Sequence, residues 1–212
     1  LAAGTLLGHL MECSAQCTGG NWSGDWWNIP IMERMGYPIA EVSEDGSAIL
    51  TKAPDTGGRV SFDTVKEQLL YEVHDPRRYL SPDVIADFTS ATLEDAGPDR
   101  VSIRGTRGSA PPPTLKSIIG HQNGWMGQGV MGYSWPDALL KARKADRIIR
   151  RQLTMVGVKA EEILTEYIGW NAIHGPTVPA PKEEPPEVYM RIAIRTATRE
   201  EAERLWRFIP YL

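Results

Sequence analysis

The sequence has 212 residues, of which 42% are apolar and 24% are charged, and its formal net charge is −4. This composition is typical of a soluble globular protein with one sizeable domain or two small ones. The acidic balance argues against a general nucleic-acid binder, which needs a basic surface to displace counterions. The sequence has no apolar run near the roughly 20 residues that span a bilayer, and it shows no signal peptide. We therefore expect a cytoplasmic protein whose partners include neither nucleic acid nor a membrane.

The opening segment predicts a helix over residues 3–18 that ends at Gly19, because glycine closes a helix readily in the left-handed conformation. One stripe of this helix is apolar and carries both cysteines of the chain, and the neighbouring stripe is polar. The apolar stripe consists of Leu6, Leu10, Cys13 and Cys17. The polar stripe consists of His9, Glu12 and Gln16.

Two hairpin strands and a second helix are predicted next. The strands cover residues 38–42 and 47–51 and flank Glu44-Asp45-Gly46, since Asp-Gly is a strong hairpin signal. The sequence Thr64-Val65-Lys66-Glu67 predicts a capping box that opens a helix over 64–74. Asp75-Pro76 ends that helix, because the residue before a proline avoids the helical conformation.

Residues 83–134 show the short apolar runs and turn residues of β-structure. The predicted strands are 83–88, 100–104, 114–120 and 127–133. Beyond them the pattern predicts a helix over 136–156, a strand over 163–170, a strand over 188–196 and a helix over 198–209.

These elements predict an α+β fold, with a hairpin-rich mixed sheet and three or four helices. We expect residues 1–173 to form the main αβ segment, 174–186 to be a Pro-rich connector, and 187–212 to add a strand and a helix that return to the main domain. The chain begins without methionine and stops right after a predicted helix, so both ends look cut from a longer chain. A missing N-terminal portion or a partner chain is therefore expected to complete the main segment.

The side chains of the first helix allow three kinds of chemistry. His9 can act as a general acid or base that Glu12 orients, or it can activate Cys13 as a thiolate nucleophile. His and Cys four residues apart can also bind a metal ion, but no second cluster of such residues exists, so we expect no metal site. The alternative to all three is a buried helix whose thiols act as small apolar groups and whose histidine is only hydrogen-bonded.

Two Thr-Gly-Gly turns, at residues 18–20 and 56–58, form the second candidate site. Consecutive glycines allow backbone N–H groups to point together and hold an anion. Lys52 precedes the second turn and Arg59 follows it, and a cation beside such a turn suits a phosphate or a carboxylate. The simpler interpretation is that these glycines only permit tight turns.

Two further segments can also meet a ligand. Arg104 and Arg107 stand at the end of a predicted strand, where they can bind the phosphate of coenzyme A or form an ordinary solvated turn. The tryptophan-rich loop at residues 22–27 can line an apolar pocket for a lipid-like chain, or it can simply pack.

Four ordered motifs resemble the acyclic terpene utilisation (AtuA-like) family, over about residues 1–195. The motifs are GHLMECSAQCTGGNWSGDW, GYPIAEVSEDGSAILTKAPDTGG, TVKEQLLYEVHDPRRYLSPDVIADF and GPDRVSIRGTRG. In that family the matching segment follows an N-terminal α/β portion. The resemblance therefore implies a homo- or hetero-oligomer in which another chain supplies that portion, unless it is merely missing from this sequence.

The family's genes are associated with the breakdown of citronellol and geraniol through branched acyl-CoA thioesters. The resemblance thus implies a catabolic, cytoplasmic role with a small-molecule acyl-CoA or another acidic ligand. A coenzyme A thioester would be the substrate, and the resemblance leaves any cofactor unknown.

The leading hypothesis is a lyase- or hydratase-type enzyme, or one subunit of it. Its catalytic candidates are His9, Glu12 and Cys13. Its ligand-binding candidates are Gln16, Thr18, Gly19, Gly20, Lys52, Thr56, Gly57, Gly58, Arg104 and Arg107. The competing hypothesis is a non-catalytic subunit that binds acyl-CoA or assembles a larger complex.

Overall fold

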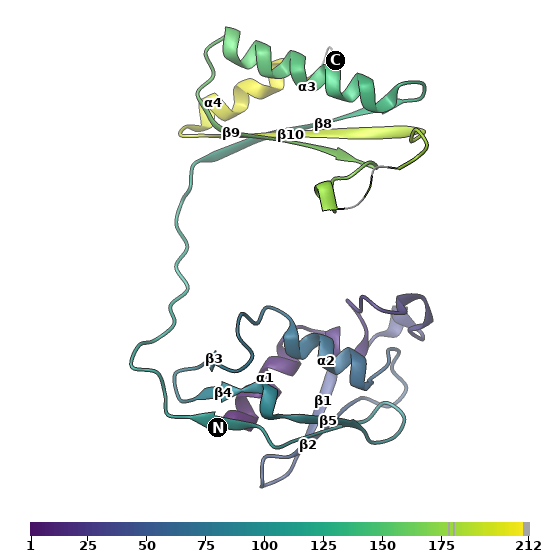
Figure 1. Cartoon of the computed structure of the whole chain (residues 1–212), viewed down its shortest axis with the longest axis vertical. Coiled ribbons are helices and arrows are strands. Elements are labelled where there is room, and N and C mark those ends of the chain that lie inside the picture. The colour runs from purple at the N-terminus through teal and green to yellow at the C-terminus, as the bar shows by residue number, and fades with distance from the viewer. Residues whose placement is uncertain (178, 180, 210–212) are drawn as a thin grey trace. The chain divides into compact units, whose positions relative to one another are not determined.

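A computed structural model describes residues 1–177, 179 and 181–209. The chain divides into two compact units, Leu1–Ile118 and Ile119–Leu212, which we call unit 1 and unit 2 (Figure 1). The described residues form four α-helices and three antiparallel sheets. The predicted α+β class is confirmed. No helix of the described part is long and apolar enough to cross a bilayer.

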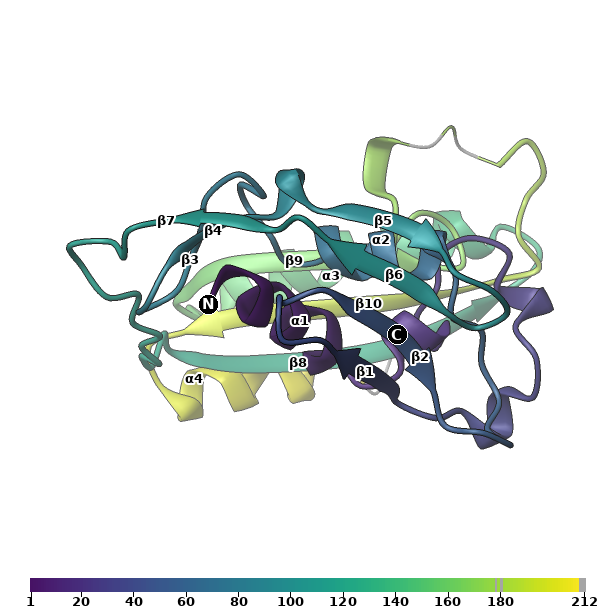
Figure 2. The same ribbon diagram turned by 90° about the horizontal axis from the view of Figure 1, so that it is seen from below.

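Unit 1 contains two sheets and two helices. The larger sheet has the strand order β1-β2-β6-β5, and the smaller has the order β3-β4-β7. The larger sheet consists of β1 (Pro38–Val42), β2 (Ala48–Lys52), β5 (Thr92–Asp95) and β6 (Val101–Arg104). The smaller sheet consists of β3 (Tyr79–Leu80), β4 (Ile85–Asp87) and β7 (Arg107–Ser109). Helix α1 (Ala2–Glu12) contacts both β1 and β4, so it links the two sheets (Figure 2).

The core of unit 1 forms where the apolar faces of α1, α2 (Phe62–Leu70) and the larger sheet meet. Its fully buried members include Leu6, Leu10, Leu50, Val65, Phe88 and Val101. Burial of this apolar surface is the main force that holds short elements of this kind together. The first helix therefore uses the predicted stripe of leucines for packing.

The predicted helix over 3–18 is wrong in its second half. Helix α1 ends at Glu12, and a short 3-10 helix, η1 (Gln16–Thr18), follows. Ser14 between them has a φ of 52°, which no right-handed helix can contain. Gly19 closes η1 in the left-handed conformation, as predicted for the end of this segment.

The predicted capping box is displaced by one turn. The N-cap of α2 is Ser61 rather than Thr64, and Thr64 is its partner in the capping box. The Ser61 side chain accepts a hydrogen bond from the Thr64 N–H, and Thr64 Oγ1 accepts one from the Ser61 N–H at 3.0 Å. Thr64 is buried and also donates to the Cys17 carbonyl at 2.8 Å. The helix ends at Leu70, earlier than predicted, and Glu72 follows with a φ of 57°.

Unit 2 is one antiparallel sheet with both of its α-helices on one side (Figure 1). Its strand order is β8-β10-β9, so the last strand of the chain lies in the middle. The elements are β8 (Trp125–Ser134), α3 (Ala138–Met155), β9 (Ala160–Ile168), β10 (Glu187–Thr196) and α4 (Arg199–Glu203). Two 3-10 helices complete the unit, η5 (Gly175–Thr177) and η6 (Arg204–Arg207). Met190, Ile192 and Ile194 of β10 pack against Ile149 and Leu153 of α3.

Two further differences concern the segments around this sheet. Residues 114–120 form no strand, and Leu115, Ile118 and Ile119 are exposed, because no described strand lies beside them to complete a ladder. The last predicted helix is α4 followed by η6. Residues 174–186 join β9 to β10 within unit 2, and the domain boundaries predicted at 173/174 and 186/187 stay a prediction.

Candidate functional site in unit 1

His9 lies on the buried face of α1 and is only 4% exposed. Its Nε2 lies 2.8 Å from the Gln68 carbonyl oxygen of α2, and its Nδ1 lies 2.8 Å from Glu12 Oε1. Both partners are acceptors, so the ring satisfies both only when each nitrogen carries a proton. His9 therefore joins α1 to α2, and both of its nitrogens are engaged inside the protein.

Two aromatic rings enclose His9. The centroids of the Tyr79 and Phe88 rings each lie 5.4 Å from that of His9. Burial raises the pKa of the Tyr79 hydroxyl, and the nearby charges of Glu12 and Cys13 raise it further. Hence Tyr79, Glu12 and Cys13 lie close enough to influence one another electrostatically. The side chain of Glu12 is 51% exposed, in contrast to His9.

The two cysteines differ in their environment. Cys13 is partly exposed, whereas Cys17 is buried and its thiol donates to the Leu10 carbonyl at 3.0 Å. Burial, and then the charge of Cys13, raise the pKa of Cys17 to about 12. Cys17 is therefore a neutral thiol at physiological pH. In the part of the chain that the structure describes, no group of three His, Cys, Asp or Glu side chains is placed to hold a metal ion.

The two Thr-Gly-Gly turns lie against each other. The N–H of Arg59, directly after the second turn, donates to the Thr18 carbonyl of the first at 2.9 Å. Gly58 has a φ of 92°, and a Cβ atom on it would lie 2.6 Å from that same carbonyl oxygen. The glycine is thus required by both the backbone conformation and the close approach of the two turns.

The N–H groups of the turns have partners within unit 1. Those of Gly19 and Gly20 donate to the carbonyls of Gln16 and Ala15, and those of Gly57 and Gly58 donate to Arg34 and Pro30. Thr18 Oγ1 also donates internally, to the carbonyls of Ala15 and Gly36 at 2.9 and 2.6 Å. These hydrogen bonds within unit 1 account for the donor groups of the turns without a ligand, and the predicted anion-binding role of the turns stays a prediction.

The predicted cations are dispersed over unit 1. Lys52 Nζ donates to the Thr56 carbonyl at 2.7 Å and lies 3.5 Å from Asp99, so Lys52 fixes the loop before the second turn. Thr56 Oγ1 donates to the Ala53 carbonyl at 2.7 Å. Arg104 forms an ion pair with Glu94, and the exposed Arg107 contributes only its backbone N–H, to Ser90 Oγ.

A cleft of about 530 Å³, which we call the Gln16 cleft, lies between the segment after α1 and helix α2. Its lining residues are Gln16, Asn21, Trp22, Ser23, Asp63, Lys66, Glu67, Leu70 and Tyr71. Gln16 is only 4% exposed, yet its side-chain amide makes no hydrogen bond to any described residue. Gln16 lines the cleft, so its amide can form hydrogen bonds with a ligand there.

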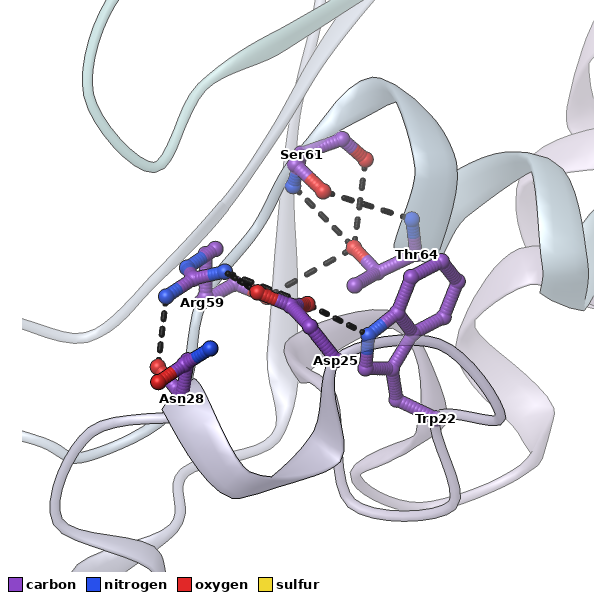
Figure 3. A network of polar contacts seen from close by, with 6 residues as sticks. All are labelled: Trp22, Asp25, Asn28, Arg59, Ser61 and Thr64. Atoms are coloured by element: carbon purple, nitrogen blue, oxygen red, sulfur yellow. Dashed lines mark hydrogen bonds and ion pairs between the residues drawn. The ribbon is translucent and has the colours of Figure 1, made fainter.

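A polar network fixes the wall of this cleft (Figure 3). Trp22 Nε1 donates to Asp25 Oδ1 at 2.9 Å, and Arg59 Nη1 lies 3.2 Å from Asp25 Oδ2. Arg59 Nη2 also donates to the Asn28 carbonyl at 2.5 Å. The hydrogen bond from Trp22, followed by that from Arg59, holds the pKa of Asp25 below its usual range. The second Thr-Gly-Gly turn is thereby connected through Arg59 to Trp22.

Charged side chains of α2 form the opposite wall. Glu67 accepts from the Ser23 N–H and hydroxyl at 3.1–3.3 Å, which ties the loop to the helix. Lys66 Nζ lies 5.4 Å above the Phe62 ring and has no carboxylate partner among the described residues. The sequence identified Gln16 and the tryptophan loop as candidates but missed Lys66, Leu70 and Tyr71. The only signal for these residues is their spacing along one face of the predicted second helix.

A second pocket, of about 310 Å³, lies beside the segment that follows α2. Glu72 lines it, together with His74, Arg78, Tyr79 and Lys116, among others. Through Tyr79 this pocket reaches the Glu12 and Cys13 side chains.

Comparisons with known proteins give one match. Searches of curated proteins and of solved structures find none. The sequence profile described as "Acyclic terpene utilisation family protein AtuA" matches residues 1–212. The profile covers every described element of both units, including the Gln16 cleft and the paired turns. The chain is therefore a member of the AtuA family of acyclic terpene utilisation.

Proposed function

We propose that the chain serves acyclic terpene breakdown by binding a branched acyl-CoA thioester, with the acyl end of the ligand in the Gln16 cleft. The observation that supports this most directly is the position of Gln16 in the cleft lining, where its side-chain amide makes no hydrogen bond to a described residue. An amide offers both a donor and an acceptor, which match a thioester carbonyl and the amide groups of the pantetheine arm. Trp22, Leu70 and Tyr71 supply apolar surface for a branched hydrocarbon chain.

Lyase or hydratase chemistry is the reaction class we propose, with Glu12 as the proton-transfer group. Hydration of an unsaturated thioester adds the oxygen of water to the β-carbon and a proton to the α-carbon, so it needs no oxidant. One carboxylate can take the proton from water and return it to the α-carbon. Glu12 is half-exposed and is oriented by His9 at 2.8 Å, and His9 is itself held by Gln68. In this proposal Glu12 is the catalytic residue and His9 positions it. Glu12 lies near Tyr79 and outside the lining of the Gln16 cleft, so the proposal requires the thioester to reach from the cleft to Glu12.

One observation favours the alternative, a non-catalytic acyl-CoA-binding subunit. His9 packs between Tyr79 and Phe88 with both nitrogens occupied, as a purely structural histidine would. The variant Glu12→Gln separates the two candidates. Lost hydration of an enoyl-CoA with retained ligand binding would support the enzyme, whereas the binding subunit shows no hydration in either form.

The binding proposal is tested by calorimetry with citronellyl-CoA and geranyl-CoA, with octanoyl-CoA and free coenzyme A as comparison ligands. We expect the branched thioesters to bind best. We expect the substitution Gln16→Leu to weaken the binding of the branched thioesters by about 10-fold, the equivalent of about 1.4 kcal/mol. Gln152→Leu is the matched control, because Gln152 also has an unpartnered amide oxygen but lies in α3 of unit 2. Equal affinity of wild type and Gln16→Leu would place the ligand elsewhere, and failure of every thioester to bind would refute the function.

A further inference from the structure

Helices α3 and α4 lie on one face of the sheet of unit 2, and only the short η5 lies on the side of the other face among the described helices of this unit (Figure 1). Strand register assigns alternate residues to each face. On the covered face, Val188, Met190, Ile192 and Ile194 are almost fully buried. The opposite face, which we call the open face, has four cross-strand rows. From β8 through β10 to β9 they are Gly132–Tyr189–Ile168, Val130–Arg191–Glu166, Gln128–Ala193–Leu164 and Met126–Arg195–Glu162.

The open face exposes more apolar surface than a solvated sheet face needs. Met126 is 64% exposed, Leu164 54% and Val130 53%. Tyr189 lies over Gly132 of the neighbouring strand, and its ring is 45% exposed. Several large apolar side chains exposed on one sheet face commonly mark an interface.

The charges of this face are paired within it. Arg191 forms an ion pair with Glu166 and donates to Gln128 Oε1 at 2.9 Å, and Arg195 lies 2.9 Å from Glu162. The two arginines lie on the middle strand β10 and the two glutamates lie opposite them on β9, so the charges of the four rows sum to zero. A charged partner such as nucleic acid finds no excess of positive charge here. The open face of a second copy of the chain would therefore meet no net charge repulsion. Each arginine would also keep its glutamate partner when the two faces are buried against each other.

The same face carries a partly exposed aromatic ring, Tyr189, at one end and a hollow at the other. A hollow of about 220 Å³ lies at the Met126–Arg195–Glu162 end, where Trp125, Leu164 and Ala193 also line it. This volume is below the roughly 300 Å³ of ordinary small-molecule pockets, but it can admit one large side chain. Tyr189, which is 45% exposed, lies over Gly132 at the opposite end of the face. A two-fold axis across the strands would bring Tyr189 of each copy to the hollow of the other, as an isologous interface requires.

We propose that two copies of this chain pair through the open face of unit 2, sheet against sheet, with Tyr189 of each copy seated in the other's hollow. Strands of nine or ten residues with a spacing of about 4.8 Å give a face of about 30 by 14 Å. Pairing two such faces removes on the order of 1,000 Å² of accessible surface, which is at the lower limit for specific interfaces. The dimer is therefore reversible and depends on protein concentration.

The test is sedimentation velocity of the full chain over a wide concentration range. We expect a change from the 23.5 kDa monomer to a species of twice that mass. Leu164→Lys on the open face should shift the dissociation constant upward by at least 10-fold. Leu140→Lys is the matched control: Leu140 has a similar exposure, at 61%, but lies on α3. It should leave the dissociation constant unchanged.

Tyr189→Lys is the second variant, should Leu164→Lys fail to fold as judged by its melting curve. A wild-type chain that stays monomeric at every concentration overturns the proposal. So does a dimer that both open-face variants leave intact, since its interface then lies elsewhere. A monomer whose open-face side chains resist hydroxyl-radical labelling also overturns it, because another part of the same chain then covers the face.

Discussion

His9 and Gln68 hold each other reciprocally across the contact between α1 and α2. The Gln68 amide donates to the His9 carbonyl at 2.8 Å, and His9 Nε2 lies 2.8 Å from the Gln68 carbonyl. The side chain of each residue therefore forms a hydrogen bond with the backbone carbonyl of the other. Such a pair links two helices through bonds that neither helix can make alone.

This pair predicts a strong, coupled loss of stability. We expect His9→Ala and Gln68→Ala each to lower the free energy of unfolding by about 2–3 kcal/mol. The double variant should lose about 1 kcal/mol less than the sum, because the two hydrogen bonds hold the same contact between α1 and α2, which either single substitution already loosens. Urea unfolding of the four proteins measures the coupling. His121→Ala, at an exposed position, is the control and should change little. Additive losses would mean that the two residues do not interact in solution.

The close approach of the Thr-Gly-Gly turns predicts a large difference between two glycine substitutions. Gly58→Ala should destabilise the protein by more than about 2 kcal/mol, because it adds a clash with the Thr18 carbonyl to the strain of a positive φ. Gly97→Ala should cost only about 1 kcal/mol: Gly97 also has a positive φ, of 117°, but has no neighbour within 4 Å of an added Cβ. Thermal unfolding of both variants compares the two effects. Equal losses would show that the turns do not pack as closely as the structure indicates.

The Asp25 carboxylate predicts a loss of stability in acid. Its pKa in the folded protein lies below the usual 3.8 because Trp22 and then Arg59 donate to it. The ionised Asp25 carboxylate therefore stabilises the folded protein fully at pH values above its pKa in the unfolded chain. This stabilisation is lost as the pH falls through the lower pKa of Asp25 in the folded protein. The difference in melting temperature between wild type and Asp25→Asn should be constant near neutral pH and shrink below about pH 4. A difference that does not change with pH would contradict the ionic role of Asp25.

The two thiols should differ in reactivity. Iodoacetamide at pH 8 should modify Cys13 while Cys17 stays unmodified, since burial raises the pKa of Cys17 to about 12 and its thiol is not accessible. Peptide mass spectrometry over time measures both rates. In Cys13→Ser the native protein should take up no label, and the unfolded protein should take up one. Labelling of Cys17 at the rate of a free thiol would contradict its burial.

Local chemistry allowed part of the fold to be predicted. The β1–β2 hairpin lies where Asp45-Gly46 indicates it, because Asp45 Oδ1 accepts from the Ser47 N–H and hydroxyl at 2.9 and 2.7 Å. The strand predicted over 114–120 is wrong for the opposite reason. Its β-branched and apolar residues favour extended backbone, but a strand also needs a neighbour, and a local pattern carries no information about one.

The site was harder to predict, because its partners are distant in sequence. The sequence left open whether His9 is catalytic or packed, and the acceptor that holds its Nε2 is the carbonyl of a residue 59 positions away. Gln16 was named as a ligand-binding candidate. The cleft around it exists only once η1 docks on α2, and this tertiary contact cannot be derived from the periodicity of either segment.

Arg59 makes the first Thr-Gly-Gly turn and the loop that forms one wall of the Gln16 cleft dependent on each other. Its backbone N–H holds the first Thr-Gly-Gly turn, and its guanidinium holds the loop that presents Trp22. Substitutions in the loop at residues 21–28 are therefore not independent of the residue at position 59. Exchanging this loop between family members to alter ligand preference would succeed only if residue 59 were transferred with it.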